Sequence, residues 1–220
     1  MSKEEKKENI ITRWERDFRV SLPQDNKVVI VGYLTENFEY SYMEKNGERY
    51  YRSKVKVRRP DRNKTVDFVP ISVPESLIKN TAKGKKIELI GKIRIHRSWK
   101  KDGKQQYTDL HVMVLDCRIV TTCVKNYINI VFLEGKLMKE GHYGEITKKA
   151  DFMLGIGEKE NLSFVPCIGW GKALNTLKGM KIGTDISFFG RFQSRKFFKE
   201  NEEGERKEKM VFEISTLNIL

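Results

Sequence analysis

A short segment in the first half of the chain carries cations in a pattern that suits a polyanion. Over the thirteen positions 52–64, seven basic residues stand against one acid, Asp61. The seven are Arg52, Lys54, Lys56, Arg58, Arg59, Arg62 and Lys64. Because two of the lysines alternate with Val55 and Val57, a strand here would present cations on one face and valines to a core. Since a solvated face usually mixes both signs, we interpret this segment as a contact for phosphate groups.

Two other segments place aromatic rings among cations, on what the sequence predicts to be long polar hairpins. The first contains Arg94, Arg97, Trp99 and Lys100, and the second contains Arg191, Arg195, Lys196, Phe197 and Phe198. Stacking of a base on such a ring contributes roughly 1–3 kcal/mol and tolerates any base, while the cations follow the phosphates. Phe192 is the exception, because it follows Gly190 as Ile93 follows Gly91, and we expect it to be buried.

No catalytic or metal-binding pattern is present. The sequence has no Walker loop, HExxH or GxSxG motif, and Asp67, Asp109 and Asp116 occur singly. The spacing of His111, Cys117 and Cys123 matches no familiar zinc site. We expect no enzyme activity, no cofactor and no metal. A nuclease whose carboxylates converge only in the fold is a distant alternative.

The overall charge agrees with a polyanionic partner. The 220 residues carry 43 Lys and Arg against 30 Asp and Glu, which gives a net charge of +13. Nucleic acid is the first candidate, and an anionic membrane surface is the second. The sequence shows no long apolar run and no signal peptide, and its three cysteines suit a reducing compartment. We expect a cytoplasmic, nucleoid-associated protein.

The elements that position these residues are repeated. Phe68-Val69-Pro70 recurs 96 residues later as Phe164-Val165-Pro166. Residues 26–34 correspond to 129–137, with Asn, Gly and Leu in matching places, and residues 87–93 correspond to 186–192. We therefore predict an all-β chain of two five-stranded units, each with one short helix, over residues 26–122 and 123–220. The size and element order favour tandem OB-fold barrels over a generic barrel.

Local signals refine this model. Ile10, Ile11, Trp14 and Phe18 have helical spacing, so residues 1–25 are predicted to form a helix that packs on the first barrel or a partner subunit, with contact to DNA as the alternative. Asn46-Gly47 predicts a hairpin, whose tyrosines at 40, 42, 50 and 51 either stack on a ligand or pack across the turn. Short helices are expected from Pro74 to about Lys83 and from Lys172 to Leu177.

The second half resembles the bacterial single-stranded DNA-binding protein family. The resemblance rests on Phe164 to Lys172, the short helix, Phe188 to Phe192 and the following basic arm, in that order. It implies stacking by Phe164, Trp170 and Phe197, with Lys172 as a phosphate contact. The first half is interpreted as a more diverged copy in which only Phe68 carries over cleanly. Pro74 stands in the place of Trp170, and Trp99 lies one residue beyond that of Phe197.

The resemblance also implies a function and an assembly. It predicts sequence-tolerant binding and protection of single-stranded DNA in replication, recombination or repair, by a homodimer that presents four OB-folds. Residues 1–123 carry 27 basic against 17 acidic residues (+10) and residues 124–220 carry 16 against 13 (+3), so the first unit is expected to rely more on charge. The family's acidic tail is missing from this sequence, which leaves recruitment of other proteins in doubt. The alternatives are an assembly module of a primosome or mobile element, or an RNA-binding protein.

Overall fold

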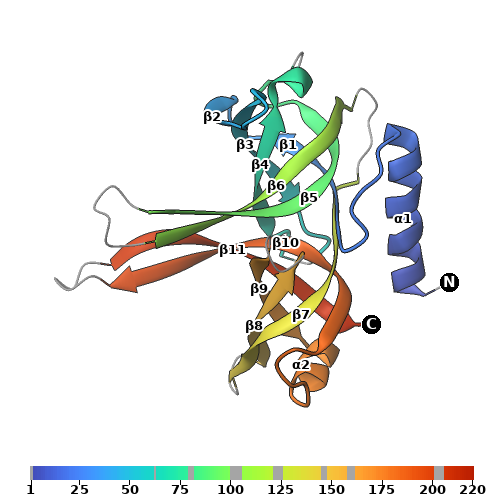
Figure 1. The fold of residues 1–220 in the computed structure, drawn as a ribbon, viewed down its shortest axis with the longest axis vertical. Coiled ribbons are helices and arrows are strands. Elements are labelled where there is room, and N and C mark those ends of the chain that lie inside the picture. The colour runs from blue at the N-terminus through green and yellow to red at the C-terminus, as the bar shows by residue number, and fades with distance from the viewer. Residues whose placement is uncertain are drawn as a thin grey trace.

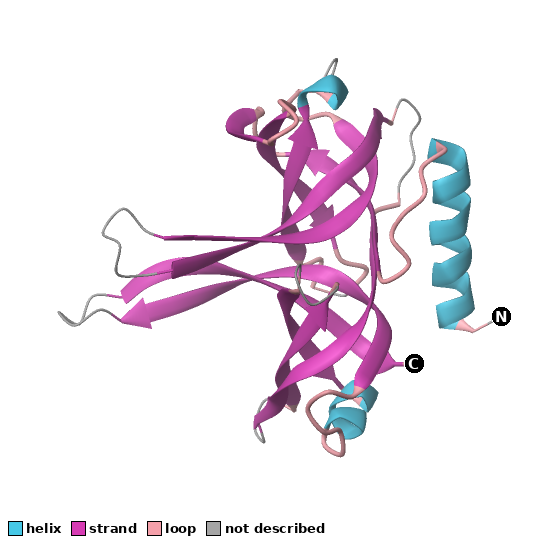
Figure 2. Cartoon of the chain, viewed as in Figure 1, coloured by secondary structure: helices cyan, strands magenta, loops and turns pink. Residues whose placement is uncertain are grey.

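The chain is built almost entirely from strands. The computed structural model describes residues 2–61, 63–78, 82–99, 106–120, 126–144, 148–157, 162–200 and 206–220. The eleven strands found among these residues form one continuous sheet that is rolled into two barrels. Figures 1 and 2 show the barrels stacked along the long axis, with a helix beside them and two long hairpins projecting from the opposite side.

The first barrel closes through five strands. They are β1 (Asn26–Leu34), β3 (Arg49–Arg58), β4 (Val66–Pro74), β5 (Lys86–Trp99) and β6 (Gln106–Ile119). β1 pairs with both β3 and β5, β5 pairs with β6, and a parallel contact between β4 and β6 completes the ring. A further strand, β2 (Glu39–Met43), pairs with β3 around the predicted hairpin turn, where Gly47 has φ 86°.

The second barrel repeats this connectivity. Its elements are β7 (Ile128–Gly144), β8 (Lys149–Ile156), β9 (Ser163–Trp170), α2 (Lys172–Leu177), β10 (Asp185–Glu200) and β11 (Arg206–Ile219). Here too one contact is parallel, between β9 and β11, and β7 pairs with both β8 and β10. Five strands with a helix after the third and this closure form an OB-fold. The predicted all-β class with two tandem OB-folds is confirmed.

The two short helices differ. α2 covers Lys172–Leu177, the residues predicted from the sequence. In the first barrel the described part of the expected helix is a single 3-10 turn, η1 (Glu75–Leu77). No side chain caps this turn, and the Ile78 backbone N–H bonds to the Glu75 carbonyl at the 3-10 spacing. The described residues therefore form a 3-10 turn and do not continue into an α-helix.

The barrels are joined edge to edge by β1 and β7, which pair in antiparallel fashion. Val28 lies opposite Val131, its counterpart in the repeat, so the two barrels are related by an approximate twofold axis at this point. The matching asparagines have the same task in each barrel. Asn26 donates to the carbonyl of Ile93 and accepts from its N–H, and Asn129 does the same with Phe192. Each side chain therefore ties the first strand of its barrel to the fourth.

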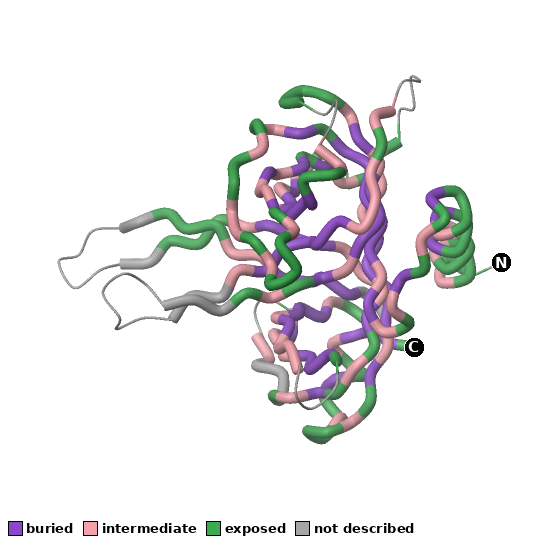
Figure 3. The backbone as a smooth tube through the Cα atoms, turned by 45° about the horizontal axis from the view of Figure 1, so that its top comes forward, coloured by how far each residue is buried: buried purple, intermediate pink, exposed green. Residues whose placement is uncertain are grey.

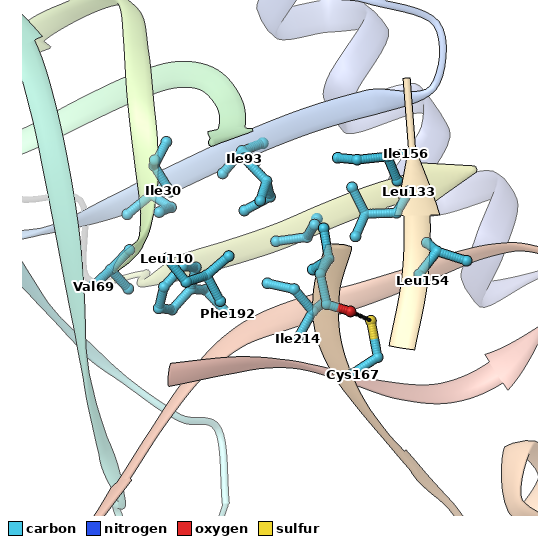
Figure 4. Packing of buried hydrophobic residues seen from close by; sticks show 14 of the residues in the cluster. Ile30, Val69, Ile93, Leu110, Leu133, Leu154, Ile156, Cys167, Phe192 and Ile214 are labelled. Atoms are coloured by element: carbon cyan, nitrogen blue, oxygen red, sulfur yellow. Dashed lines mark hydrogen bonds between the residues drawn. The ribbon is translucent and has the colours of Figure 1, made fainter. Parts of the chain in front are cut away.

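One hydrophobic cluster runs through both barrels. It includes Ile30, Val69 and Leu110 of the first and Leu133, Leu154, Phe192 and Ile214 of the second (Figure 4). Phe192 is fully buried, as its place after Gly190 predicts. Cys167 also lies inside, and burial raises the pKa of its thiol. Figure 3 shows the buried residues concentrated in the barrels and along the face that meets the helix.

The N-terminal helix α1 (Lys3–Phe18) covers the outer face of the joint. Ser2 and Glu5 form a capping box at its start. Its buried side chains Ile11, Trp14 and Phe18 belong to a second apolar cluster that includes Val29 of the first barrel and Ile130 and Phe189 of the second. The sequence predicted packing on the first barrel or on a partner subunit. In the structure the helix packs on both barrels of its own chain, because β1 and β7 form one continuous surface.

Candidate nucleic-acid interface

Two strand pairs extend beyond the barrels as arms. β5 and β6 stay paired out to Trp99 and Gln106, and β10 and β11 stay paired out to Glu200 and Arg206. The two arms run side by side and point away from α1 in all three views (Figures 1–3). The aromatic and basic segments predicted on long hairpins therefore lie together on one side of the molecule.

Exposed rings lie on the second arm. Phe197 is 44% exposed and Phe198 is 59% exposed. Because successive residues of a strand point to opposite faces, each face of this arm carries one exposed ring. Large apolar side chains on a two-stranded arm, outside any core, are available to a ligand. Trp99 lies on the first arm, but its side chain and that of Arg97 are outside the described residues, as is Lys100.

The cationic face of β3 forms as the alternation predicts. Val55 and Val57 are buried in the first barrel, whereas Lys56 and Arg58 are exposed. The neighbouring strand β4 follows the same rule, with Val69 buried and Phe68 half-buried on the outward side. Phe68 lies opposite Lys56 in the register. An aromatic ring and a cation therefore share the outer face of these strands.

Many of the predicted phosphate contacts are already paired with acids. The pairs are Arg52–Asp109 at 2.9 Å, Lys54–Glu36 at 3.2 Å, Arg59–Asp67 at 2.6 Å, Arg94–Glu44 at 2.8 Å, Arg195–Glu213 at 3.1 Å and Lys196–Glu208 at 3.0 Å. Most of these pairs are partly exposed, and exposed ion pairs hold their partners weakly. A phosphate could therefore compete for these cations, except where the acid is buried.

Arg59 is the clearest of the exceptions. Its Nε and Nη2 donate to the two carboxylate oxygens of Asp67 at 2.7 and 2.6 Å, and this bonding raises the pKa of Arg59. Asp67 is fully buried and also accepts from the Ser194 backbone N–H at 2.9 Å. The Ser194 hydroxyl in turn accepts from the Phe68 N–H. Arg59 and Asp67 thus tie β4 of the first barrel to β10 of the second, a positioning role that the sequence interpretation missed.

Four of the predicted cations are exposed and have no ion-pair partner among the described residues. They are Lys56, Arg58, Lys64 and Lys172. Arg62 lies outside the described residues. Arg191 differs from the rest, because it is half-buried between the barrels and its Nη2 bonds to Gln193 at 3.3 Å. The charge available to a strand of nucleic acid in the described structure therefore centres on β3 and the loop after it.

The remaining aromatic candidates are partly covered. Phe164 and Trp170 are half-buried, and the indole N–H of Trp170 is buried without a hydrogen-bond partner. In the β2–β3 hairpin, Tyr42 stacks on Tyr50 with centroids 5.0 Å apart and Tyr40 meets Tyr51 edge-on. These tyrosines thus pack across the hairpin, while Tyr40 also remains exposed.

A pocket that sequence reasoning missed lies between this hairpin and the first arm. Its volume is about 530 Å³, and Tyr42, Met43, Arg94 and His111 line part of it. His111 is buried and neither ring nitrogen has a hydrogen-bond partner. Burial lowers the pKa of His111, against the opposing effect of Asp109, so the ring is neutral near pH 7. The only sequence signal is a lone histidine on the strand that returns from the arm.

Two classes of site receive no support within the described residues. No group of three or more His, Cys, Asp or Glu side chains is placed to hold a metal ion. No helix there is both long and apolar enough to cross a membrane.

Comparison with known proteins agrees with the fold. Residues 25–119 match the family model described as "Single-strand binding protein family". The predicted resemblance to that family is confirmed. The match falls on the first barrel, so it gives no support to the interpretation of the second as the closer copy. No curated protein matches.

Two solved structures share the architecture of both barrels. Wild-type single-stranded DNA binding protein from Thermus aquaticus superposes with a TM-score of 0.66 at 17% identity, covering 89% of this chain and 91% of that one. A deletion mutant of the same protein gives a TM-score of 0.65 at 16% identity, covering 89% and 93%. At this level of identity the likeness concerns the fold.

Proposed function

We propose that the chain binds single-stranded DNA without sequence preference. The observation that carries the proposal is the second arm, which exposes Phe197 and Phe198 on its two faces beside basic side chains. An exposed ring can stack on any base, and each stacked base contributes roughly 1–3 kcal/mol. The family match and the likeness to the Thermus aquaticus protein support the same reading.

The path of the DNA strand is inferred from the places where basic and aromatic side chains lie close together. Lys56 and Arg58 on β3 and Lys64 in the loop after it neutralise phosphates, and Phe68 lies on the neighbouring strand β4. From there the arms continue the path, since the Phe68 N–H contacts Ser194 at the base of the second arm. Binding by stacking and charge needs no catalysis and no cofactor.

The experiment is a titration of the full chain, followed by tryptophan fluorescence, with oligo-dT, matched oligo-U RNA and a duplex of equal length. We expect oligo-dT to bind at least about tenfold more tightly than the duplex, whose bases cannot stack on protein rings. Equal or stronger binding of RNA would favour the RNA-binding alternative. Weak binding to all three, together with tight binding to a protein partner, would favour an assembly module.

The biological setting is part of the same proposal. We place the chain in replication, recombination or repair in the bacterial cytoplasm, with a homodimer that presents four barrels to the strand. Mass measurement in solution, with and without a long oligonucleotide, tests the assembly. A dimer in both states supports it, and a monomer in both contradicts it.

A further inference from the structure

A pocket of about 360 Å³ lies where the two barrels meet the N-terminal half of α1, away from the arm tips. This volume is at the lower end of the range for small-ligand sites. Ile10, Ile128 and Phe189 form part of an apolar wall. The charged lining consists of Lys7, Arg58, Arg59, Asp67 and Arg191, and the polar side chains are Tyr127, Asn129 and Ser215. Four cations therefore face a single carboxylate.

That carboxylate is already engaged. Asp67 receives two hydrogen bonds from Arg59, and no described carboxylate forms an ion pair with Arg191, although Asp67 and Asp61 lie near enough to favour its charged form. Burial lowers the pKa of Arg191, and the nearby charge of Arg59 lowers it further, against the opposing effects of Asp67 and Asp61. Burial also lowers the pKa of Lys7, and the charges of Lys3 and Arg191 lower it further, against the opposing effect of Glu4. Positive charge that is partly removed from water and not paired favours the binding of an anion.

Two buried polar atoms in the pocket also lack partners. Arg191 Nε and Ser215 Oγ are both buried without a hydrogen bond, and Ser215 is only 2% exposed. The two residues lie opposite each other on the paired strands β10 and β11. Buried donors without partners are rare in folded proteins. An oxyanion bound beside these two side chains would accept hydrogen bonds from both atoms.

The approximate twofold axis provides an internal control. In the first barrel the register positions equivalent to Arg191 and Ser215 are Lys92 and Met113, which also lie opposite each other. The residue that corresponds to Asp67 is Ser163, and it lines the related pocket with Lys92. An arginine and an unpartnered hydroxyl at these two register positions thus occur in the second barrel only, and Arg94, which lines the first-barrel pocket, is paired with Glu44. The site therefore depends on these particular residues and is not a general feature of the joint between the barrels.

We propose that this pocket binds a phosphate monoester. Arg191 and Ser215 donate to the phosphate oxygens, Lys7 and Arg58 supply further positive charge, and the apolar wall contacts the attached group. Arginine suits this role because its planar fork matches phosphate geometry. A monoester dianion also neutralises more of the excess positive charge than a singly charged diester does. The phosphate could belong to a free mononucleotide or to the 5′ end of a DNA strand. Arg58 is shared with the proposed DNA path along β3, but binding in the pocket does not depend on the proposed contacts along the arms.

The first test is calorimetric titration of the full chain, without DNA and at constant ionic strength, using inorganic phosphate and adenosine 5′-monophosphate. We expect both to bind. R191M and S215A should each weaken binding by at least about tenfold, as the loss of a charge-assisted or buried hydrogen bond predicts. K92M, at the equivalent position of the first barrel, should bind as the wild type does. Because S215A removes only one unpartnered hydroxyl, its melting temperature should match the wild type.

The second test distinguishes the two sources of phosphate. Oligo-dT with a 5′-phosphate is compared with the same strand ending in a 5′-hydroxyl. A preference for the phosphorylated strand that R191M abolishes identifies the strand end, whereas monophosphate binding without such a preference identifies a free nucleotide. Either result supports the pocket. Absence of phosphate and monophosphate binding together with no 5′ preference overturns it, as does wild-type affinity in both variants, whatever the arms bind.

Discussion

Asp67 is the buried group on which the joint between β4 and β10 depends, and its replacement by alanine should be costly. Its side chain is 1% exposed and accepts two bonds from Arg59 and one from the Ser194 backbone. D67A would leave the Arg59 guanidinium, whose side chain is 14% exposed, without a counter-charge. Breaking a buried ion pair by removing one partner typically costs about 3–5 kcal/mol. We expect a loss of that size in the free energy of unfolding.

Urea unfolding followed by tryptophan fluorescence and circular dichroism measures this loss. Removing both partners in R59M/D67L should recover a large part of it, because no charge is then stranded and only the Ser194 N–H lacks an acceptor. D185A is the control. Asp185 pairs with Lys136 at 2.7 Å, but the two side chains are 77% and 58% exposed, so the expected loss is under about 1 kcal/mol. A loss for D67A no larger than that of D185A would refute the account of the joint.

Three further predictions concern the binding surface and the buried histidine. F197A/F198A should weaken oligo-dT binding by about 2 kcal/mol or more without lowering the melting temperature, because the rings are exposed; unchanged affinity would exclude stacking there. K56Q/R58Q should reduce the magnitude of the slope of log affinity against log salt by about 1.4, because each lost phosphate contact contributes about 0.7. An unchanged slope would show that neither cation contacts the DNA strand. Because burial lowers the pKa of His111, the unfolded chain binds the proton first, and the free energy of unfolding should fall as pH drops below about 6.5. H111L should remove the part of this fall that is due to His111, measured as urea midpoints between about pH 7.5 and about pH 5. A pH dependence equal to that of the wild type would contradict this role of His111.

The fold was largely predictable because the repeat carries it. The strand alternation at Val55 and Val57, the buried place of Phe192 and the extent of α2 all follow from local patterns in the sequence. The matching asparagines at 26 and 129 were visible as well, although their bonds to the fourth strand of each barrel were not. The described part of the expected helix in the first barrel is only the 3-10 turn η1, which the local pattern did not distinguish from an α-helix.

The site was less predictable because it depends on partners that are distant in the sequence. Asp67 appears in the sequence as an isolated acid, and only the crossing of β4 and β10 brings Ser194 to it. Similarly, Asp109 reaches Arg52 through the sheet. Counting cations therefore overestimates the charge that is available to a ligand. Pairing of this kind is set by strand register and by the closure of the barrels, which composition and spacing do not encode.

The salt dependence of oligo-dT affinity, measured on the full chain by tryptophan fluorescence, tests the proposed function most directly. The four exposed predicted phosphate contacts without ion-pair partners, Lys56, Arg58, Lys64 and Lys172, at about 0.7 per phosphate for a single strand, predict a slope of about −3 or steeper for log affinity against log salt. Stacking on the arm predicts that measurable binding persists at high salt, where the charge contribution is small. Absence of binding at low salt, or an affinity that does not change with salt, would contradict the account.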